Sequence, residues 1–541
     1  MSEILSISSL LNSLSFLHFA EWGILLHLVV VVALIIRILW VQKNTGIAIA
    51  WLTIMFAIPV IGVIGYILIG EPTIGRRYQQ RSERTKKLLQ QIPANNLLQI
   101  NPQKQDTLNP LIDQKYTGLS QFGETRTGFA ASAGHKLQLL TDVDVLFDKL
   151  IADINHANQL ILLEFYIVYP KGRVLEVFEV LKAAAKRGVE CYLLADSVGS
   201  FGLFSGNTAK NLEAAGVEVH QSMPVGLFKT LFKRTDVRNH RKIVVIDDSI
   251  GYTGSFNLVD PRYFKQDKNL GQWVDVAMRV KAYQQNSVVA AMAGVIVTDI
   301  GAESRTNFAT LQERVNSYTR RLNLTKPAIN DVNNKASVLD TPDDDYDTSV
   351  QVPNQPAEYN VVAQLIPSAP QMTAHVIYNT LVNAIHRADK KICITTPYFV
   401  PDESLMGALT TASRRGVAVT LIIPKKVDFF FVQHASQAFY QELLEAGVTI
   451  ALFDAGLLHA KTVVIDDSYC LFGTVNMDMR SFYLNMEVSL AIYSPKMVAH
   501  VAECQQTYLQ YCEIMSLESW QIRPRILQVF DNGIRLFSPL L

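Results

Sequence analysis

The chain has 541 residues, and its 49 Lys and Arg residues are balanced by 49 Asp and Glu residues. A chain of this length predicts two or three domains. The zero net charge argues against a dedicated nucleic-acid binder, so no nucleic-acid partner is expected. The five cysteines are scattered without paired motifs. They predict neither a metal site nor a disulfide framework, and they fit a reducing compartment.

Two apolar runs dominate the first seventy residues. Residues 22–41 are interrupted only by His27 and Arg37, and residues 46–70 carry no charge. Each run is long enough to cross a hydrocarbon core of about 30 Å as a helix. A cleaved signal peptide would need a basic start and a small-residue cleavage site, and two buried core helices would not be apolar on every face. We therefore expect residues 1–75 to form a two-helix transmembrane hairpin.

Basic residues flank the second run and orient the hairpin. The segment that follows contains Arg76, Arg77, Arg81, Arg84, Lys86 and Lys87, whereas the turn between the runs offers only Lys43. The positive-inside rule then places both termini and the catalytic part of a multi-pass protein on the cytoplasmic side of a bacterial inner membrane. Residues 76–134 are interpreted as a basic juxtamembrane segment and linker, lying beside anionic head groups or forming a solvated helix.

The remainder of the chain reads as two copies of one α/β unit, residues 135–321 and residues 361–541, the second including a C-terminal tail. Each copy contains an apolar strand, a helix that ends at a glycine (Gly188 or Gly416), and a second strand. This alternation predicts a sheet covered by helices on both faces. Residues 322–360, rich in Asn, Asp, Pro and Ser, predict a mobile linker between the copies.

The first copy carries an insertion of 12 residues before its central motif, as the spacing of Gly216 and Gly447 from the two motifs indicates. Within it, residues 224–234 alternate apolar and basic side chains at helical spacing. The pattern fits a helix on a membrane surface, and it fits an ordinary half-buried helix equally well.

The two copies share one pattern of polar residues. In the first copy it consists of His240, Lys242, Asp247, Ser255 and Asn257. The second copy repeats it 219 residues later as His459, Lys461, Asp466, Thr474 and Asn476. A single match of this kind can arise by chance, but two matches in step within a duplicated domain indicate a catalytic site.

The residue types suit phosphoryl transfer. His240 and Lys242 are two apart on an apolar strand, so their side chains share one face, whereas Asp247 at an odd spacing faces away. Two ammonium groups, with Ser, Thr and Asn as further substrate-binding donors, can neutralise phosphoryl oxygens without a metal. One imidazole can attack phosphorus while the other protonates the leaving alcohol. Asp247 and Asp466 are the less certain catalytic members, and a scaffolding role fits them better.

The two motifs resemble the paired HxKxxxxD signature of the phospholipase D superfamily. "EPTIGRR", "NHRKIVVIDD", "GQWVD", "TPYFVPDE" and "GTVNMDMRSFYLNMEV" are similar to bacterial cardiolipin synthases in particular. The resemblance implies two α/β/α sandwich halves in a pseudo-two-fold arrangement, a shared active site, a phosphohistidine intermediate, and no cofactor or metal. It carries over the catalytic roles of His240, Lys242, Asp247, His459, Lys461 and Asp466, and it favours the histidine of the first half as the nucleophile.

The same resemblance implies the reaction. One phosphatidylglycerol would give its phosphatidyl group to a histidine and release glycerol, and a second phosphatidylglycerol would accept the group to form cardiolipin. Alternatives are a phospholipase D-type hydrolase with water as acceptor, a nuclease, another phosphatidyltransferase using the same site, or a membrane scaffold that has lost catalysis. The aromatic run 429–431 is read either as a contact for acyl chains or as plain core.

Overall fold

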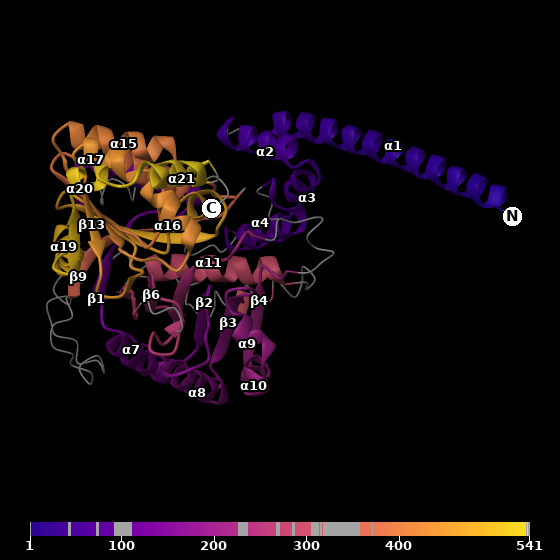
Figure 1. The fold of residues 1–541 in the computed structure, drawn as a ribbon. Coiled ribbons are helices and arrows are strands. Elements are labelled where there is room, and N and C mark those ends of the chain that lie inside the picture. Colours follow the sequence, from indigo (N-terminus) through magenta and orange to yellow (C-terminus); the bar gives the residue numbers. More distant parts are fainter. Residues whose placement is uncertain are drawn as a thin grey trace. The chain divides into compact units, whose positions relative to one another are not determined.

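The computed structural model describes residues 2–41, 45–71, 75–90, 111–225, 236–266, 271–283, 287–304, 313, 316–317, 357–370, 372–536 and 538. The chain divides into two compact units (Figure 1), Met1–Thr73 with Gly226–Asp236, and Ile74–Val225 with Val237–Leu541. Residues 226–234 of the insertion and residues 322–356 of the expected linker lie outside the described residues.

The first unit contains the helices α1 (Ser2–Val41), α2 (Thr45–Ala57) and α3 (Pro59–Ile69). Within α1, the stretch Trp22–Val41 has a mean hydropathy of 2.8 and is long enough to cross a membrane. The second apolar run forms two short helices instead of the expected single one. Pro59 lacks an N–H and disfavours helical geometry at Ile58, whose φ and ψ are −137° and 74°.

The helices α2 and α3 pack closely against each other. The rings of Trp51 and Tyr66 meet edge to face at 5.4 Å. Gly62 allows the approach, since a Cβ there would lie 2.6 Å from the Cα of Met55. With 13 and 11 residues, neither helix reaches across a hydrocarbon core of about 30 Å by itself.

The second unit is built on one mixed sheet of 15 strands, in the order β19-β13-β12-β10-β15-β16-β18-β9-β1-β8-β6-β5-β2-β3-β4. The strands of the first half are β1 (Ser132–Leu140), β2 (Leu160–Phe165), β3 (Glu190–Asp196), β4 (Val217–Ser222), β5 (Lys242–Ile246), β6 (Ile250–Gly254), β7 (Trp273–Val274) and β8 (Ala277–Ala282). Those of the second half are β9 (Ala357–Ser368), β10 (Lys391–Thr395), β11 (Phe399–Val400), β12 (Ala418–Pro424), β13 (Thr449–Phe453), β14 (Leu457–Leu458), β15 (Thr462–Ile465), β16 (Tyr469–Gly473), β17 (Met477–Asp478), β18 (Glu487–Ile492) and β19 (Cys512–Met515).

The strand order is the same in both halves when read outward from the centre. The strands β1, β8, β6, β5, β2, β3 and β4 correspond to β9, β18, β16, β15, β10, β12 and β13. At the centre β1 and β9 pair antiparallel, with Ser132 opposite Ala363. This ladder joins the two half-sheets edge to edge in the pseudo-two-fold arrangement that the duplicated sequence predicts.

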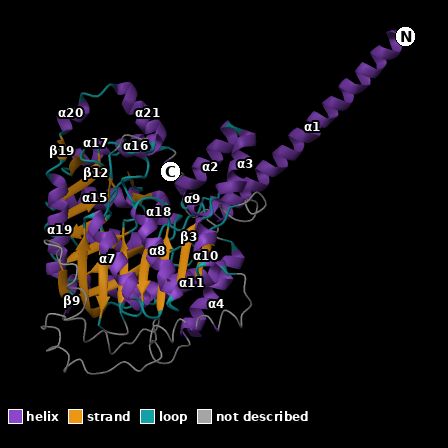
Figure 2. Ribbon diagram, turned by 90° about the horizontal axis from the view of Figure 1, so that it is seen from below, coloured by secondary structure: helices purple, strands orange, loops and turns teal. Residues whose placement is uncertain are grey.

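Helices cover both faces of the sheet (Figure 2). The helices of the first half are α4 (Arg76–Gln90), α6 (Gln114–Thr127), α7 (Val143–His156), α8 (Arg173–Lys186), α9 (Phe201–Ser205), α10 (Thr208–Ala214) and α11 (Val288–Glu303). Those of the second half are α14 (Val376–His386), α15 (Glu403–Arg414), α16 (Phe430–Gln437), α17 (Tyr440–Glu445), α18 (Met479–Tyr483), α19 (Pro495–Leu509), α20 (Leu517–Gln521) and α21 (Arg525–Arg535). The helices α11 and α19 share one apolar core with strands of both halves, while the core under α7 and α8 and the core under α14 and α15 belong to separate halves.

Two helices of this body lie in the stretch interpreted from sequence as a juxtamembrane segment and linker. The helix α4 packs on α11 through a buried stripe that includes Tyr78 and Thr85. Gly301 of α11 permits this contact, because a Cβ there would lie 2.3 Å from Thr85 Oγ1. Arg81, expected near lipid head groups, instead donates to the carbonyl oxygens of residues 302–304 at the end of α11. The helix α6 packs on α14 and β9 of the second half.

Candidate active site

Each motif histidine lies just before a central strand, and its backbone is held by the opposite half. The N–H of His240 donates to the carbonyl oxygen of Met486, and the N–H of His459 donates to that of Val274, both at 2.9 Å. Around these bonds β7 and β14 pair in parallel, as Asn239 and Met486 do in a single bridge. Backbone hydrogen bonds alone therefore hold the histidine of each half against the opposite half.

The side chain of each histidine also contacts an acid from the opposite half. Nδ1 of His240 lies 2.9 Å from both carboxyl oxygens of Glu487 in the second half. Nδ1 of His459 lies 2.6 Å from Oδ1 of Asp275 in the first half. An acid at Nδ1 fixes the orientation of an imidazole ring and directs Nε2 to the opposite side, where it can react.

Both motif lysines share a face with their histidine, as the strand spacing predicts. The Nζ of Lys242 donates to the carbonyl oxygen of His240 at 2.7 Å, and the Nζ of Lys461 donates to that of His459 at 2.5 Å. Both ammonium groups are almost completely buried. Each lysine also affects the charge on the histidine of the other motif, so the four side chains belong to one electrostatic site.

Burial dominates the protonation of this site. It lowers the pKa of Lys242 to about 8 and that of Lys461 to about 7. Burial and the neighbouring Lys461 lower the pKa of His459 to about 4, and burial and Lys242 lower the pKa of His240 as well. An anion that enters between the lysines would restore their charge, as a phosphodiester does.

The two supporting acids titrate differently. Burial raises the pKa of Glu487 to about 8. Burial also acts on Asp275, but His459, Lys461 and Ser255 outweigh it and lower the pKa of that carboxyl to about 2. At neutral pH, Asp275 is therefore ionised and Glu487 is protonated, although both occupy equivalent places beside a histidine.

The motif aspartates lie at the far ends of the strands that follow the histidines. The carboxylate of Asp247 accepts the backbone N–H groups of Asn158, Gln159 and Leu160 at 2.8–3.0 Å. Asp466 accepts three equivalent N–H groups from residues 389–391 and also pairs with Lys115 of α6 at 2.5 Å. These bonds tie the turn after each central strand to the start of the neighbouring strand, which is a scaffolding arrangement.

The hydroxyl groups expected to bind phosphate have other partners here. Ser255 donates to Asp275 at 2.6 Å, and Thr474 donates to Glu487 at 2.5 Å. A hydroxyl has one proton to donate, and here it goes to the acid and orients it. Phosphate binding by Ser255 and Thr474 stays a prediction.

The two asparagines present unpaired polar atoms. Oδ1 of Asn257 accepts the N–H of Ile167 at 3.1 Å. Nδ2 of Asn257 and Oδ1 of Asn476 are buried and have no hydrogen-bond partner among the described residues. A buried polar atom of this kind is costly unless a ligand completes it, which keeps both asparagines as substrate-binding candidates.

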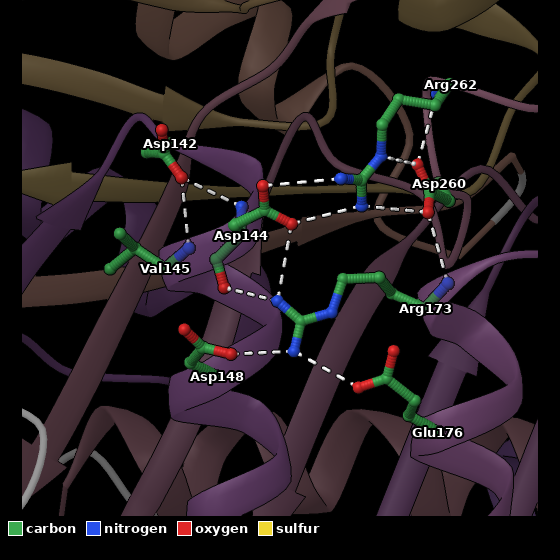
Figure 3. Close-up of polar contacts among 8 residues, drawn as sticks. All are labelled: Asp142, Asp144, Val145, Asp148, Arg173, Glu176, Asp260 and Arg262. Atoms are coloured by element: carbon green, nitrogen blue, oxygen red, sulfur yellow. Dashed lines mark hydrogen bonds and ion pairs between the residues drawn. The ribbon is translucent and has the colours of Figure 1, made fainter.

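A charged network fixes the loop that carries Ser255 and Asn257 (Figure 3). At the end of that loop Asp260 accepts the backbone N–H of Arg173 at the start of α8 and pairs with Arg262. Arg173 and Arg262 both reach Asp144 of α7. Gly172 leaves room for the carboxylate, because a Cβ there would lie 2.3 Å from Oδ2 of Asp260.

Aromatic rings enclose the histidines. Tyr166 lies edge to face with His240, their ring centroids 4.9 Å apart, and Trp273 lies 4.4 Å from the ring of His459. Such walls exclude water and leave the chemistry to the imidazoles and ammonium groups. No group of three His, Cys, Asp or Glu side chains with metal-binding geometry occurs in the described part of the chain.

Sequence reasoning did not single out Asp275 and Glu487, although both lie in segments that carry the family resemblance. Asp275 follows Ser255 by 20 residues, whereas Glu487 follows Thr474 by 13. The constant spacing of 219 residues between the two copies, which identified the other residue pairs, does not hold for Asp275 and Glu487. An acid near the start of an apolar strand in each copy was the available signal, since Asp275 lies two residues before β8 and Glu487 is the first residue of β18.

A duplicated α/β/α unit that brings two His–Lys pairs into one site is the architecture of phospholipase D-like enzymes. The family model described as "Cardiolipin synthase, PLD-like domain" matches residues 150–287 and 381–507. A solved phosphatidylserine synthase from Haemophilus influenzae is similar in fold, with a TM-score of 0.52 and 14% identity, and the match covers 78% of this chain and 100% of that one.

Two relatives cover nearly the whole length. Cardiolipin synthase A of Cronobacter sakazakii is 35% identical over 538 residues, covering 97% of this chain and 100% of the relative. Cardiolipin synthase A of Yersinia pseudotuberculosis is 36% identical over 506 residues, covering 94% and 95%. The chain belongs to the cardiolipin synthase family.

Proposed function

We propose that the protein is a phosphatidyltransferase that makes cardiolipin and glycerol from two molecules of phosphatidylglycerol. The observation that carries this proposal is the pair of histidines, each backed by an acid from the opposite half and flanked by a buried lysine. The lysines compensate the phosphoryl charge, and the imidazoles supply a nucleophile and a proton carrier.

The reaction runs in two balanced steps. First, the bound phosphodiester anion favours the imidazolium form of His459, which takes up a proton from solution at Nε2. Nε2 of His240 then attacks phosphorus of one phosphatidylglycerol, the bond from phosphorus to the glycerol oxygen breaks, and His459 gives that oxygen its Nε2 proton. Glycerol leaves and the phosphatidyl group stays on His240. Next, His459 takes the proton of a terminal hydroxyl on a second phosphatidylglycerol. The oxygen attacks phosphorus, the bond to Nε2 breaks, and cardiolipin forms.

Asp275 gives His459 its role in these steps. An ionised carboxylate at Nδ1 stabilises the imidazolium that forms when His459 takes a proton from the acceptor alcohol. Lys242 and Lys461 bind the phosphoryl oxygens as the negative charge on them grows. The rings of Tyr166 and Trp273 limit the entry of water, which competes with the acceptor alcohol.

The test is an assay of the purified full chain with labelled phosphatidylglycerol as the only lipid, in which cardiolipin, glycerol and phosphatidic acid are measured together. Equal amounts of cardiolipin and glycerol, lost in His240→Ala, support the transferase. Phosphatidic acid as the main product would identify a hydrolase with the same site. Unchanged turnover in His240→Ala would show that His240 takes no part in the reaction.

We also propose that the enzyme is anchored in the bacterial inner membrane with its catalytic unit in the cytoplasm. Trp22–Val41 supplies a spanning helix, and the basic residues after residue 75 favour the cytoplasmic side. Arg37, four residues before the end of α1, pairs at 2.5 Å with Glu71, which follows α3. The chain leaving α3 is therefore level with the last turns of α1. We infer that α2 and α3 enter and leave the membrane on one face, so the chain crosses the membrane once, within α1.

Cysteine labelling in intact cells separates this arrangement from a two-span hairpin. With one crossing, a membrane-impermeant maleimide labels Ser2→Cys from outside, and Lys43→Cys reacts only after permeabilisation. A two-span hairpin with a cytoplasmic catalytic unit gives the reverse pattern. The unsubstituted chain provides the background from its own five cysteines.

A further inference from the structure

An exposed apolar surface covers two packed helices near the C-terminus. It consists of Phe430, Phe431, Ile522, Ile526, Val529 and Phe530, and we call it the α16–α21 surface. Ile522, Ile526 and Val529 are 83%, 78% and 71% exposed. The rings of Phe430 and Phe530 lie 6.2 Å apart, so the two helices present one continuous patch. The aromatic run 429–431 is exposed and is therefore not plain core, and its contact with acyl chains stays a prediction.

Polar contacts hold α21 with this side facing outward. The buried carboxylate of Asp531 pairs with His434 of α16 at 2.7 Å and with Arg523 at 2.9 Å. Ile534 is buried beside it. Ile526 and Val529 lie on the other side of α21, while Phe530 lies at the boundary between the two sides, where its ring also contacts His434. These contacts fix the orientation of α21, so its apolar side stays exposed to the surroundings.

The surface continues to the candidate active site. Phe429, directly before α16, lies 6.0 Å from Tyr398, ring to ring. The Nζ of Lys265 lies 5.5 Å from the ring of Phe429 and 5.4 Å from that of Trp273. Trp273 in turn lies against His459. One side chain, Lys265, thus links the edge of the patch to the wall of the site.

The charge on α21 favours a lipid partner over an apolar protein groove. Its one acidic side chain, Asp531, is buried and paired, so the helix presents the positive charge of exposed Arg525, while Arg535 is half-buried against the ring of Phe439. An amphipathic helix with apolar and aromatic residues on one side and arginines beside them is typical of helices that lie in a bilayer interface. Anionic head groups attract such arginines.

We propose that the α16–α21 surface inserts into the phospholipid bilayer and sets the mouth of the active site against the head groups. The choice of a lipid partner rests on the proposed function. Insertion of an interfacial helix reaches about 5–10 Å below the head groups. A phosphatidylglycerol molecule could then move from the membrane past Phe429 and Lys265 to His459 without crossing water.

Fluorescence quenching tests the contact without using catalysis. The full-length protein carrying Ile526→Cys is labelled with an environment-sensitive dye and placed in vesicles of phosphatidylethanolamine and phosphatidylglycerol that contain nitroxide-labelled lipid. Leu175→Cys on α8, whose native side chain is 49% exposed, is the matched control. We expect strong quenching at position 526 and little at 175, after subtraction of the unsubstituted chain. Equal quenching at both positions, or energy transfer between two copies at position 526 in place of lipid quenching, would overturn the proposal.

Activity then tests the consequence. Ile526→Asp and Val529→Asp are expected to lower turnover of long-chain phosphatidylglycerol in vesicles by about tenfold or more, because a carboxylate opposes insertion. Turnover of a short-chain, water-soluble phosphatidylglycerol should change by less than about twofold, since that substrate needs no membrane contact. Leu175→Asp should affect neither. Full activity of both variants in vesicles would refute the docking role. If the dye at position 526 is quenched but the protein makes no cardiolipin, the docking surface is supported and the proposed function is refuted.

Discussion

Nδ1 of His459 lies 2.6 Å from a carboxylate oxygen of Asp275, and the two residues come from different halves of the molecule. Glu487 has the same relationship to His240. The chemical states differ, however, because the pKa of Asp275 is lowered to about 2 while that of Glu487 is raised to about 8. One histidine faces an ionised acid and the other faces a neutral one.

This difference predicts unequal effects of two isosteric substitutions. Asp275→Asn removes a negative charge that is present at pH 7, and turnover should fall by about 10²–10⁴-fold, as expected when a histidine loses its carboxylate partner. Glu487→Gln replaces an acid that is already neutral, and turnover should fall by less than about tenfold. The initial rate of cardiolipin formation measures both. Comparable losses in the two variants would mean that the acids share one charge state.

Trapping predicts which imidazole carries the phosphatidyl group. His459→Ala lacks the group that protonates glycerol in the first step and activates the acceptor alcohol in the second. With a labelled phosphatidyl ester of p-nitrophenol, whose leaving group needs no proton, the first step should still proceed, and labelled lipid should accumulate on His240 during one turnover. Acid-labile, base-stable label should then be found on the peptide that contains His240. In His240→Ala no label should be retained. Label on His459 in that variant would show that His459 is the nucleophile and His240 the proton carrier.

The buried lysines predict how substrate affinity depends on pH. The pKa of Lys461 is lowered to about 7 by burial, so its ammonium form, which the phosphodiester anion needs, is progressively lost above pH 7. The KM for phosphatidylglycerol should rise with pH by up to about tenfold per unit until the pKa of the complex is reached. Lys461→Arg keeps its charge, so its KM should stay flat until Lys242 begins to lose its proton near pH 8, with a lower kcat from altered geometry. Exposed Lys496→Arg is the matched control, and its KM profile should follow the wild type.

The motif aspartates should affect stability more than chemistry. Asp247 and Asp466 both have φ near 51°, a left-handed geometry that Asn tolerates well. Asp→Asn at either position weakens the bonds to three backbone N–H groups and should cost about 1–3 kcal/mol of unfolding free energy. Asp466→Asn should cost more, because it also breaks the pair with Lys115. Thermal unfolding measures the loss. A turnover loss as large as that of His240→Ala in a fully folded variant would restore a catalytic role.

His135 predicts a loss of stability in mild acid. Its Nδ1–H donates to the carbonyl oxygen of Val361 on β9, its Nε2 accepts the N–H of Val288, and burial lowers its pKa to about 4. Between pH 6.5 and 4 the unfolded chain binds a proton that the folded chain does not, so stability falls as the pH falls through this window. The loss reaches about 3 kcal/mol. His135→Gln should flatten this dependence in unfolding experiments, whereas exposed His386→Gln should not.

Much of the body could be predicted from the sequence because local patterns specify it. The strand spacing that placed His240 and Lys242 on one face holds, and it also directed Asp247 away. The repeat of 219 residues predicted two equivalent halves, and the mirrored strand order agrees. These features depend on residues near in sequence or on a periodicity that the duplication preserves.

The missed features depend on contacts between distant segments. Asp275 and Glu487 act on histidines more than 180 residues away, and nothing local distinguishes them from other acids before a strand. The hydrogen bonds from Ser255 and Thr474 to these acids could not be foreseen for the same reason. The prediction of a single helix over residues 46–70 was wrong for a local reason. It was based on hydropathy, which does not include the backbone restriction that Pro59 imposes on Ile58.

The exchange of acids between halves also bears on how such a molecule can evolve. A lone half could complete its histidine only by forming a symmetric dimer, and in that dimer both imidazoles would have identical surroundings. Joining the halves in one polypeptide removes the dependence of assembly on concentration and lifts the constraint of symmetry. An aspartate at one position and a glutamate at the other can then diverge in protonation. The fused chain thereby permits a division of labour between two histidines that identical subunits could not maintain.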